Sequence, residues 1–241
     1  MAATNLVVEF LGLPGAGKSS LSHLVAAQLA EHGVTVAQPS YELAHGPQPR
    51  LRRLRKMLHV ARELVTHPFA TARAARIVGA TRQPDAATRT RLLFNWLLVV
   101  ALARGARTRP GVHLLDQGVL QAVWSIALED RSETALQLLA DPALALALPD
   151  VAVVVAARLD VVHDRLCSRS AHDSRVERRR GGLVLLGRGE QLVQRVRETA
   201  AGRTLVLEVR NEGDLRHGAA ALADRLHAIV AGSLAANPSA G

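Results

Sequence analysis

The stretch that decides the fold of this 241-residue chain is Gly12-Leu13-Pro14-Gly15-Ala16-Gly17-Lys18-Ser19. It follows the pattern G-x-x-x-x-G-K-S, the phosphate-binding P-loop. The glycines let backbone N–H groups curl around a polyphosphate without a side-chain clash. Lys18 can then reach the β- and γ-phosphates, and the Ser19 hydroxyl can ligate Mg²⁺. The stretch therefore predicts a site for nucleotide phosphates.

The sequence on both sides of the loop supports this prediction. Residues 6–11 form a short run rich in strand-forming side chains. Apolar residues then recur at helical spacing over 20–29, and Gly33 marks the end of that helix. A helix that starts at the loop adds its dipole to the phosphate site. Lys18 and Lys56 are the only lysines of the chain, so a lysine in the loop argues against a chance match.

Four further segments have strand character and alternate with helical segments. They are residues 34–37, 112–115, 151–155 and 204–209. Their near-continuous apolar runs suit strands that are buried on both faces. We predict an α/β fold in which a five-stranded parallel sheet carries helices on both faces. Ligands of such sheets bind beyond the carboxyl ends of the strands, so the P-loop and the other strand ends should face one cleft.

The chain reads as one domain over residues 1–231, with a flexible tail at 232–241. A helical insertion is expected at about 48–104, between the second and third strands. Its predicted helices are 51–66, 69–79 and 86–104. The first of them is amphipathic and basic. It could close over an anionic acceptor, touch a membrane surface, or be a solvated face.

The composition predicts a folded protein in a reducing compartment. Hydrophobic residues make up 49% of the chain, and a single cysteine, Cys167, cannot form an internal disulfide. The longest apolar stretch, 97–103, is far shorter than the roughly 20 residues of a membrane span. The first strand begins by about residue 6 and leaves no room for a secretory signal peptide, so we expect a cytoplasmic protein.

The net charge of +9 comes almost entirely from arginine. One interpretation is a nucleic-acid partner. The other is a general use of arginine in place of lysine, with some arginines gathered at an anionic substrate site. Aromatic residues make up only 2% of the chain. Because nucleic-acid modules of the stacking type need exposed aromatic side chains, we favour the second interpretation.

Asp116 ends the third predicted strand and is followed by Gln117 and Gly118. A carboxylate at this place, beside the P-loop strand, can hold Mg²⁺ through water or take the proton of an acceptor hydroxyl. The sequence leaves these two roles open. The alternative is an aspartate in a plain strand-end turn, and the presence of the P-loop favours a functional role.

An arginine-rich segment, about 168–190, follows the fourth strand and its helix. It suits a lid, because arginines that close over the γ-phosphate stabilise its charge and exclude water. An exposed charged helix is the alternative.

The chain resembles the nucleoside and nucleotide kinases of the P-loop class, thymidylate kinase in particular. The resemblance rests on the P-loop, the strand-end Asp116-x-Gly118, the arginine-bearing helix 161–169 and Ser174-Arg175-Val176-Glu177. It extends from residue 6 to about residue 230. It implies the three-layer P-loop NTPase fold with a lid, the use of ATP and Mg²⁺, and a homodimer as the common assembly.

By position, the resemblance assigns the ATP phosphates to the loop and the start of the next helix. The nucleotide-binding residues would be Gly12, Leu13, Pro14, Gly15, Ala16, Gly17, Lys18, Ser19 and Ser20. Ser19 and Asp116 would organise Mg²⁺. The catalytic residues would be Lys18, Asp116, the lid-helix arginines Arg165 and Arg169, and the lid arginine Arg175. Related kinases also carry a carboxylate near the position of Glu9.

Two departures from the family pattern concern the acceptor. Members usually have Asp-Arg after the third strand, whereas this chain has Gln117. The thymidylate enzymes also place an arginine within the helix before that strand, and residues 92–101 contain none. Both differences argue against thymidine monophosphate as the acceptor.

Three functions fit the sequence. The first is an ATP-dependent kinase that moves the γ-phosphate to a hydroxyl or phosphate of an anionic or hydroxyl-bearing small molecule. The second is a regulatory NTPase whose bound nucleotide switches a partner surface, with the basic helix from Leu51 as that surface. The third is a kinase of nucleic-acid ends, which predicts steeply salt-dependent oligonucleotide binding.

Overall fold

The computed structural model describes residues 5–45, 48–128, 130, 134–168, 182–212 and 214–235. The central part of the expected lid, with Arg169 and Arg175, lies outside these residues.

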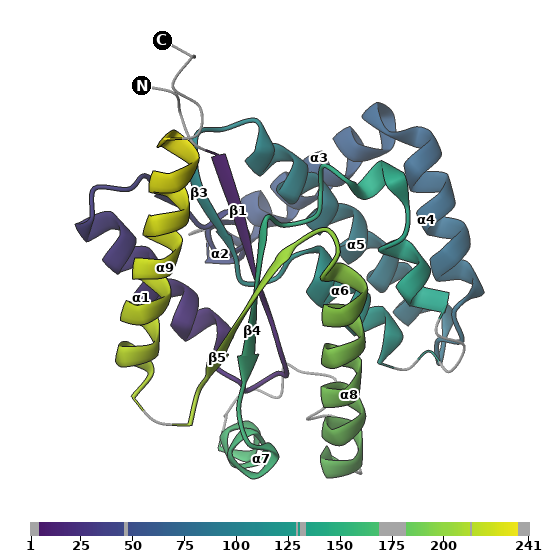
Figure 1. The fold of residues 1–241 in the computed structure, drawn as a ribbon. Coiled ribbons are helices and arrows are strands. Elements are labelled where there is room, and N and C mark those ends of the chain that lie inside the picture. Colours follow the sequence, from purple (N-terminus) through teal and green to yellow (C-terminus); the bar gives the residue numbers. More distant parts are fainter. Residues whose placement is uncertain are drawn as a thin grey trace.

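The fold is built on a sheet of five parallel strands in the order β2-β3-β1-β4-β5 (Figure 1). The strands are β1 Asn5–Leu11, β2 Val36–Ala37, β3 Gly111–Leu115, β4 Val151–Ala156 and β5 Leu205–Arg210. β1 is central, and its Val8 pairs with Leu114 of β3 and Val151 of β4. The predicted α/β class, strand number and parallel arrangement are confirmed.

β2 is shorter than the strand expected over 34–37. The N–H of Val34 donates to the Leu29 carbonyl oxygen at 3.0 Å, so this residue belongs to the turn that follows the preceding helix. The ladder with β3 therefore includes only Val36 and Ala37.

Helices cover both faces of the sheet. α1 Lys18–Glu31 and α9 Leu215–Ala235 pack together on one face. α5 Ala86–Arg107, α6 Val119–Ala127 and α8 Gly182–Ala200 lie on the other. α9 continues to Ala235, beyond the boundary at 232 that we expected for the tail. Its small residues Ala231 and Gly232 do not stop the helix, and the first proline comes only at Pro238.

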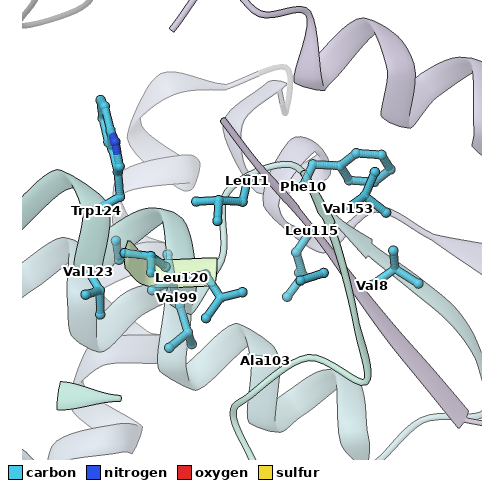
Figure 2. Packing of buried hydrophobic residues seen from close by; sticks show 14 of the residues in the cluster. Val8, Phe10, Leu11, Val99, Ala103, Leu115, Leu120, Val123, Trp124 and Val153 are labelled. Atoms are coloured by element: carbon cyan, nitrogen blue, oxygen red, sulfur yellow. The ribbon is translucent and has the colours of Figure 1, made fainter. Parts of the chain in front are cut away.

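The core lies on both sides of β1. Val7, Val8, Phe10 and Leu11 have exposed fractions of 0%. Because side chains alternate along a strand, Phe10 and Leu11 point to opposite faces. Figure 2 shows Phe10 beside Val153, and Leu11 on the side of α6 with Leu120 and Val123. This burial fixes the end of β1, and thereby the point at which the P-loop starts.

The predicted helical insertion forms a second layer outside α5. It consists of α2 Pro39–His45, α3 Pro49–Thr66 and α4 Pro68–Ala80, followed by α5. α2 is a short helix that we did not predict. α3 and α4 both pack against α5, on the right of Figure 1. The sequence places these helices correctly but does not say which face of each one is turned inward.

Shorter elements complete the chain. They are the 3₁₀ turns η1 Thr134–Leu138 and η2 Pro142–Leu144, and the helix α7 Leu159–Cys167.

α5 is the one helix of the described residues that is long and apolar enough to cross a membrane, with a mean hydropathy of 1.3 in its most apolar window. Half of that window is buried inside the protein. Trp96, Val99 and Val100 are among its buried residues. This is the pattern of a core helix that lies between the sheet and α3, as the contacts of α5 indicate.

Candidate active site

The P-loop adopts a conformation that its glycines make possible. Gly15 and Gly17 have φ values of +86° and +93°, a region that side chains disfavour. A Cβ on Gly12 would lie 2.5 Å from the carbonyl oxygen of Val155 in β4. α1 then begins at Lys18, directly after the loop. The first backbone N–H groups of α1 therefore lie where a phosphate can accept from them.

Lys18 lies over the loop that it follows. Its Nζ donates to the carbonyl oxygens of Gly12 at 2.8 Å and of Leu13 at 2.9 Å. Within the loop, the side chains of Leu13 and Ala16 are buried, whereas Ser19 and Ser20 are exposed. The ammonium group is thus held at the mouth of the loop, within reach of a phosphate that enters it.

Asp116 connects the P-loop to the helical insertion. Its Oδ2 accepts from the Ser19 hydroxyl at 3.1 Å, and its Oδ1 accepts from the Ser40 hydroxyl at 2.5 Å. Ser40 lies in the first turn of α2, directly after β2. The carboxyl ends of β1, β2 and β3 thereby contribute one residue each to a single polar cluster.

This cluster fits Mg²⁺. Mg²⁺ in nucleotide sites is held by one carboxylate and a hydroxyl, together with phosphate oxygens and water. The Ser19 hydroxyl and the Asp116 carboxylate are the two protein donors of that set, and they lie in contact. Within the described residues, no group of three or more acidic, histidine or cysteine side chains is gathered in a way that suits a metal held by protein alone.

Glu9 is a buried carboxyl group beneath the site. It belongs to β1, has an exposed fraction of 0%, and faces the first turn of α6. Its Oε1 accepts from the backbone N–H of Gln121 at 2.8 Å. Burial raises the pKa of Glu9 from 4.5 to about 7. Hydrogen bonds from backbone N–H groups at the start of α6 lower this pKa in part, and the N–H of Gln121 has the largest such effect. A Cβ on Gly118 would lie 2.5 Å from this carboxyl group, so the close approach depends on glycine.

Gln121 connects Glu9 to the phosphate loop through a second hydrogen bond. Its side-chain Oε1 accepts from the backbone N–H of Gly12 at 3.1 Å. Glu9, Gln121 and Gly12 therefore form a chain that ties the start of the P-loop to the first turn of α6. The same turn of α6 follows Asp116 in the chain. The P-loop and Asp116 are therefore both anchored to this turn.

Asn211 and Arg165 hold the opposite side of the loop. Asn211 follows β5, and its Nδ2 donates to the carbonyl oxygen of Ala16 at 2.7 Å. Arg165 of α7 has guanidinium nitrogens 3.5 Å from the carbonyl oxygens of Gly15 and Asn211. Its charge lies against the P-loop, and its role toward bound phosphate stays a prediction.

Comparisons with known proteins bear on the fold. A deoxyadenosine kinase from M. mycoides with bound dATP has 12% sequence identity and a TM-score of 0.55, with 92% of this chain and 100% of that chain covered. The same enzyme with bound dCTP gives 11% identity and a TM-score of 0.53 over 92% and 100% of the two chains. This chain has the fold of the P-loop nucleoside kinases.

Other comparisons add less. A thymidylate kinase from Ehrlichia chaffeensis is similar over 92% of this chain and 98% of that chain, at 13% identity and a TM-score of 0.49. No protein-family model matches the sequence, and no curated protein matches it significantly. The kinase fold is therefore visible in the structure and not in overall sequence similarity.

The kinase fold brings together most of the predicted site residues. Lys18, Ser19, Asp116 and Arg165 all lie at the carboxyl edge of the sheet, around the P-loop. Arg169 and Arg175 lie outside the described residues, so their roles stay predictions. Gln117, which stands where the family has arginine, is exposed.

Three polar residues of the site escaped the sequence analysis. They are Ser40, Gln121 and Asn211. Ser40 and Asn211 each follow a strand, so the rule that ligands bind at strand ends was a usable signal. Gln121 had no such signal, because its contact with Gly12 joins residues 109 positions apart.

Proposed function

We propose that this protein is an ATP-dependent phosphotransferase that moves the γ-phosphate to a hydroxyl or phosphate group of a small molecule. The observation that carries the proposal is the position of Asp116, shared between Ser19 on the phosphate side and Ser40 on the side of the helical insertion. A carboxylate in this position lies between a nucleotide in the P-loop and an acceptor held by the insertion. The kinase fold of the neighbours supports the same class of reaction.

The residues have separable roles in this proposal. The P-loop backbone and the first turn of α1 bind the phosphates, and Lys18 neutralises charge on the group that moves. Ser19 and Asp116 would hold Mg²⁺, which supplies further charge neutralisation when bound. Arg165 lies at Gly15 and adds positive charge on the far side of the loop.

Asp116 also has an oxygen, Oδ1, on the side of the helical insertion. The Ser40 hydroxyl donates to Oδ1 at 2.5 Å, so a hydroxyl group is accommodated at this atom. We infer that an acceptor hydroxyl binds beside or in place of Ser40 and gives its proton to Oδ1 as its oxygen bonds to phosphorus. The bond from phosphorus to the bridging oxygen of ADP breaks in the same transfer.

The test is transfer of label from γ-labelled ATP in the presence of Mg²⁺. Deoxynucleosides come first in the acceptor panel, because the neighbouring structures hold deoxynucleotides. Nucleosides, nucleoside monophosphates, sugars and small alcohols follow. We expect label on one class of acceptor, with a loss of about 100-fold or more in Lys18→Ala. Lys56→Ala, which changes the other lysine of the chain, should keep the activity.

Other results would contradict the proposal. Full phosphate transfer by Lys18→Ala would show that the P-loop lysine takes no part in the reaction. ATP binding with slow phosphate release and no labelled acceptor would favour the regulatory NTPase. Label on oligonucleotide ends, with steep salt dependence, would favour a nucleic-acid substrate. A cytoplasmic location, a lid around residues 168–190 and a homodimer are further expectations of the same proposal.

A further inference from the structure

α3 packs on the protein with its apolar face turned to solvent. Six large apolar residues of α3 are exposed, followed by one at the start of α4. They are Leu51, Leu54, Met57, Leu58, Leu64, Val65 and Phe69. The exposed fractions reach 61% at Met57, 80% at Val65 and 90% at Phe69. At about 100° per residue, positions 51, 54, 58, 61 and 65 form one continuous stripe along the helix.

The opposite face of α3 is held by polar contacts. Glu63 is buried and pairs with Arg104 of α5. Arg52 donates to the carbonyl oxygen of Ala44 at the end of α2. Val60 is the one large apolar residue of α3 that is buried. These contacts fix the rotation of the helix, so the outward position of the leucines follows from the packing of α3 on α5.

The exposed charges of α3 all have one sign. Arg50, Arg53, Arg55 and Arg62 are exposed, and the only acidic residue of the helix, Glu63, is buried and paired. At the same angle per residue, Arg50 and Arg53 lie on one side of the apolar stripe, and Arg55 and Arg62 lie on the other. An apolar stripe with basic flanks is the pattern of helices that lie in the interface of a membrane.

We propose that α3, with the first turn of α4, docks this protein on the surface of an anionic lipid bilayer. The leucines, Met57 and Phe69 would enter the boundary between headgroups and acyl chains, while the arginines contact the lipid phosphates and carboxylates. α3 packs on α5, and the side chains of its apolar stripe are exposed, so a flat surface can approach them. The net charge of +9 acts in the same direction.

A second copy of this chain fits the same stripe less well. A two-fold contact through α3 would bring the same surface of both copies together. Arg53, Arg55 and Arg62 of each copy would then face like charges, with no exposed acidic residue on the helix to compensate. The lipid surface, in contrast, supplies the opposite charge along the whole helix.

The test is sedimentation of the full chain with vesicles of phosphatidylcholine alone, or with about one third phosphatidylserine. We expect binding to the phosphatidylserine vesicles only, weakened by salt. Leu54→Ser/Leu58→Ser and Arg53→Gln/Arg55→Gln should each weaken it about tenfold or more. Two variants are controls. Val184→Ser changes an exposed valine of α8 and should bind like the parent chain. Arg216→Gln/Arg225→Gln removes the same charge from α9 and should weaken binding clearly less than the α3 arginine pair.

Three results would overturn the proposal. Equal binding to both vesicle types would exclude recognition of the anionic surface. Equal losses in the α3 and α9 arginine pairs would assign binding to net charge and not to α3. A dimer in sedimentation velocity that Leu54→Ser/Leu58→Ser converts to monomer would assign the stripe to a second copy. Lys18→Ala should bind vesicles normally, so failure of phosphotransfer and failure of docking can be told apart.

Discussion

The hydroxyl of Ser19 lies 3.1 Å from Oδ2 of Asp116, although the two residues are 97 positions apart in the chain. Parallel pairing of β1 and β3 brings them together, because the P-loop and Asp116 follow the same edge of the sheet. The contact is therefore a property of the fold, and it places a carboxylate beside the residue that is expected to ligate Mg²⁺.

The first prediction concerns the two sides of Asp116. Asp116→Asn keeps the size of the side chain and removes its charge, so we expect about 100-fold less phosphotransfer and weaker Mg²⁺ dependence of ATP binding. Ser40→Ala removes only the donor at Oδ1 and should cost about tenfold or less. Initial rates over a range of Mg²⁺ concentrations measure both. A Ser40→Ala defect as large as that of Asp116→Asn would contradict the assignment.

The second prediction concerns Gly17. Its φ is +93°, and a Cβ there would collide with the Nδ2 of Asn211. Gly33 is a matched control, because its φ is +75° and no heavy atom lies within 4 Å of the added Cβ. Gly33→Ala should cost about 1 kcal/mol from backbone strain alone. Gly17→Ala should cost more and abolish ATP binding, as measured by urea unfolding and nucleotide titration.

A double variant separates strain from collision at Gly17. Gly17→Ala/Asn211→Ala removes the colliding amide and should recover part of the stability that Gly17→Ala loses. If the double variant loses as much unfolding free energy as the two single variants together, or more, the collision with Asn211 is not the cause.

The third prediction concerns Arg165. Its guanidinium lies 3.5 Å from the Gly15 carbonyl oxygen, so Arg165→Gln should reduce kcat about tenfold or more. Arg158 directly precedes the same helix and pairs with Asp160 at 2.5 Å on the protein surface. Arg158→Gln is therefore the control and should keep full activity. Equal rates for both variants in the label-transfer assay would show that Arg165 takes no part in the reaction.

The sequence could predict those parts of the site whose chemistry is local. A few neighbouring residues are sufficient to predict the roles of the P-loop and Asp116, because loop geometry and strand-end position are short-range properties. Gln121 is different, since its contact with Gly12 joins residues 109 positions apart. Nothing in the neighbourhood of Gln121 indicates that the P-loop will approach it. Such partners depend on how whole elements pack.

The same limit applies to the fold. Alternating strands and helices were sufficient to predict the parallel sheet, because the inner strands β1, β3 and β4 are apolar over most of their length. The orientation of α3 was not predictable. The usual rule turns leucines inward, whereas the structure buries Glu63 and exposes Leu54 and Leu58. Packing against Arg104 of α5, which no local pattern reveals, decided the rotation of this helix.

The last prediction concerns the pH dependence of stability through Glu9. Burial raises its pKa to about 7 in the folded protein, against an ordinary value of 4.5. Between these values the folded state keeps a proton that the unfolded state has lost, so stability falls as pH rises through this window. The full effect is on the order of 3 kcal/mol, by the usual conversion of pKa shifts. Glu9→Gln removes this titration while keeping an oxygen that can accept from Gln121.

Urea unfolding of both proteins from about pH 5 to about pH 8 measures the effect of Glu9 as a difference. Glu63, whose pKa burial also raises, contributes equally to both proteins and cancels in that difference. We expect Glu9→Gln to gain stability relative to the parent chain as pH rises. A difference that stays constant over this range would mean that Glu9 is already ionised at low pH in the folded state, stabilised by the backbone N–H groups at the start of α6.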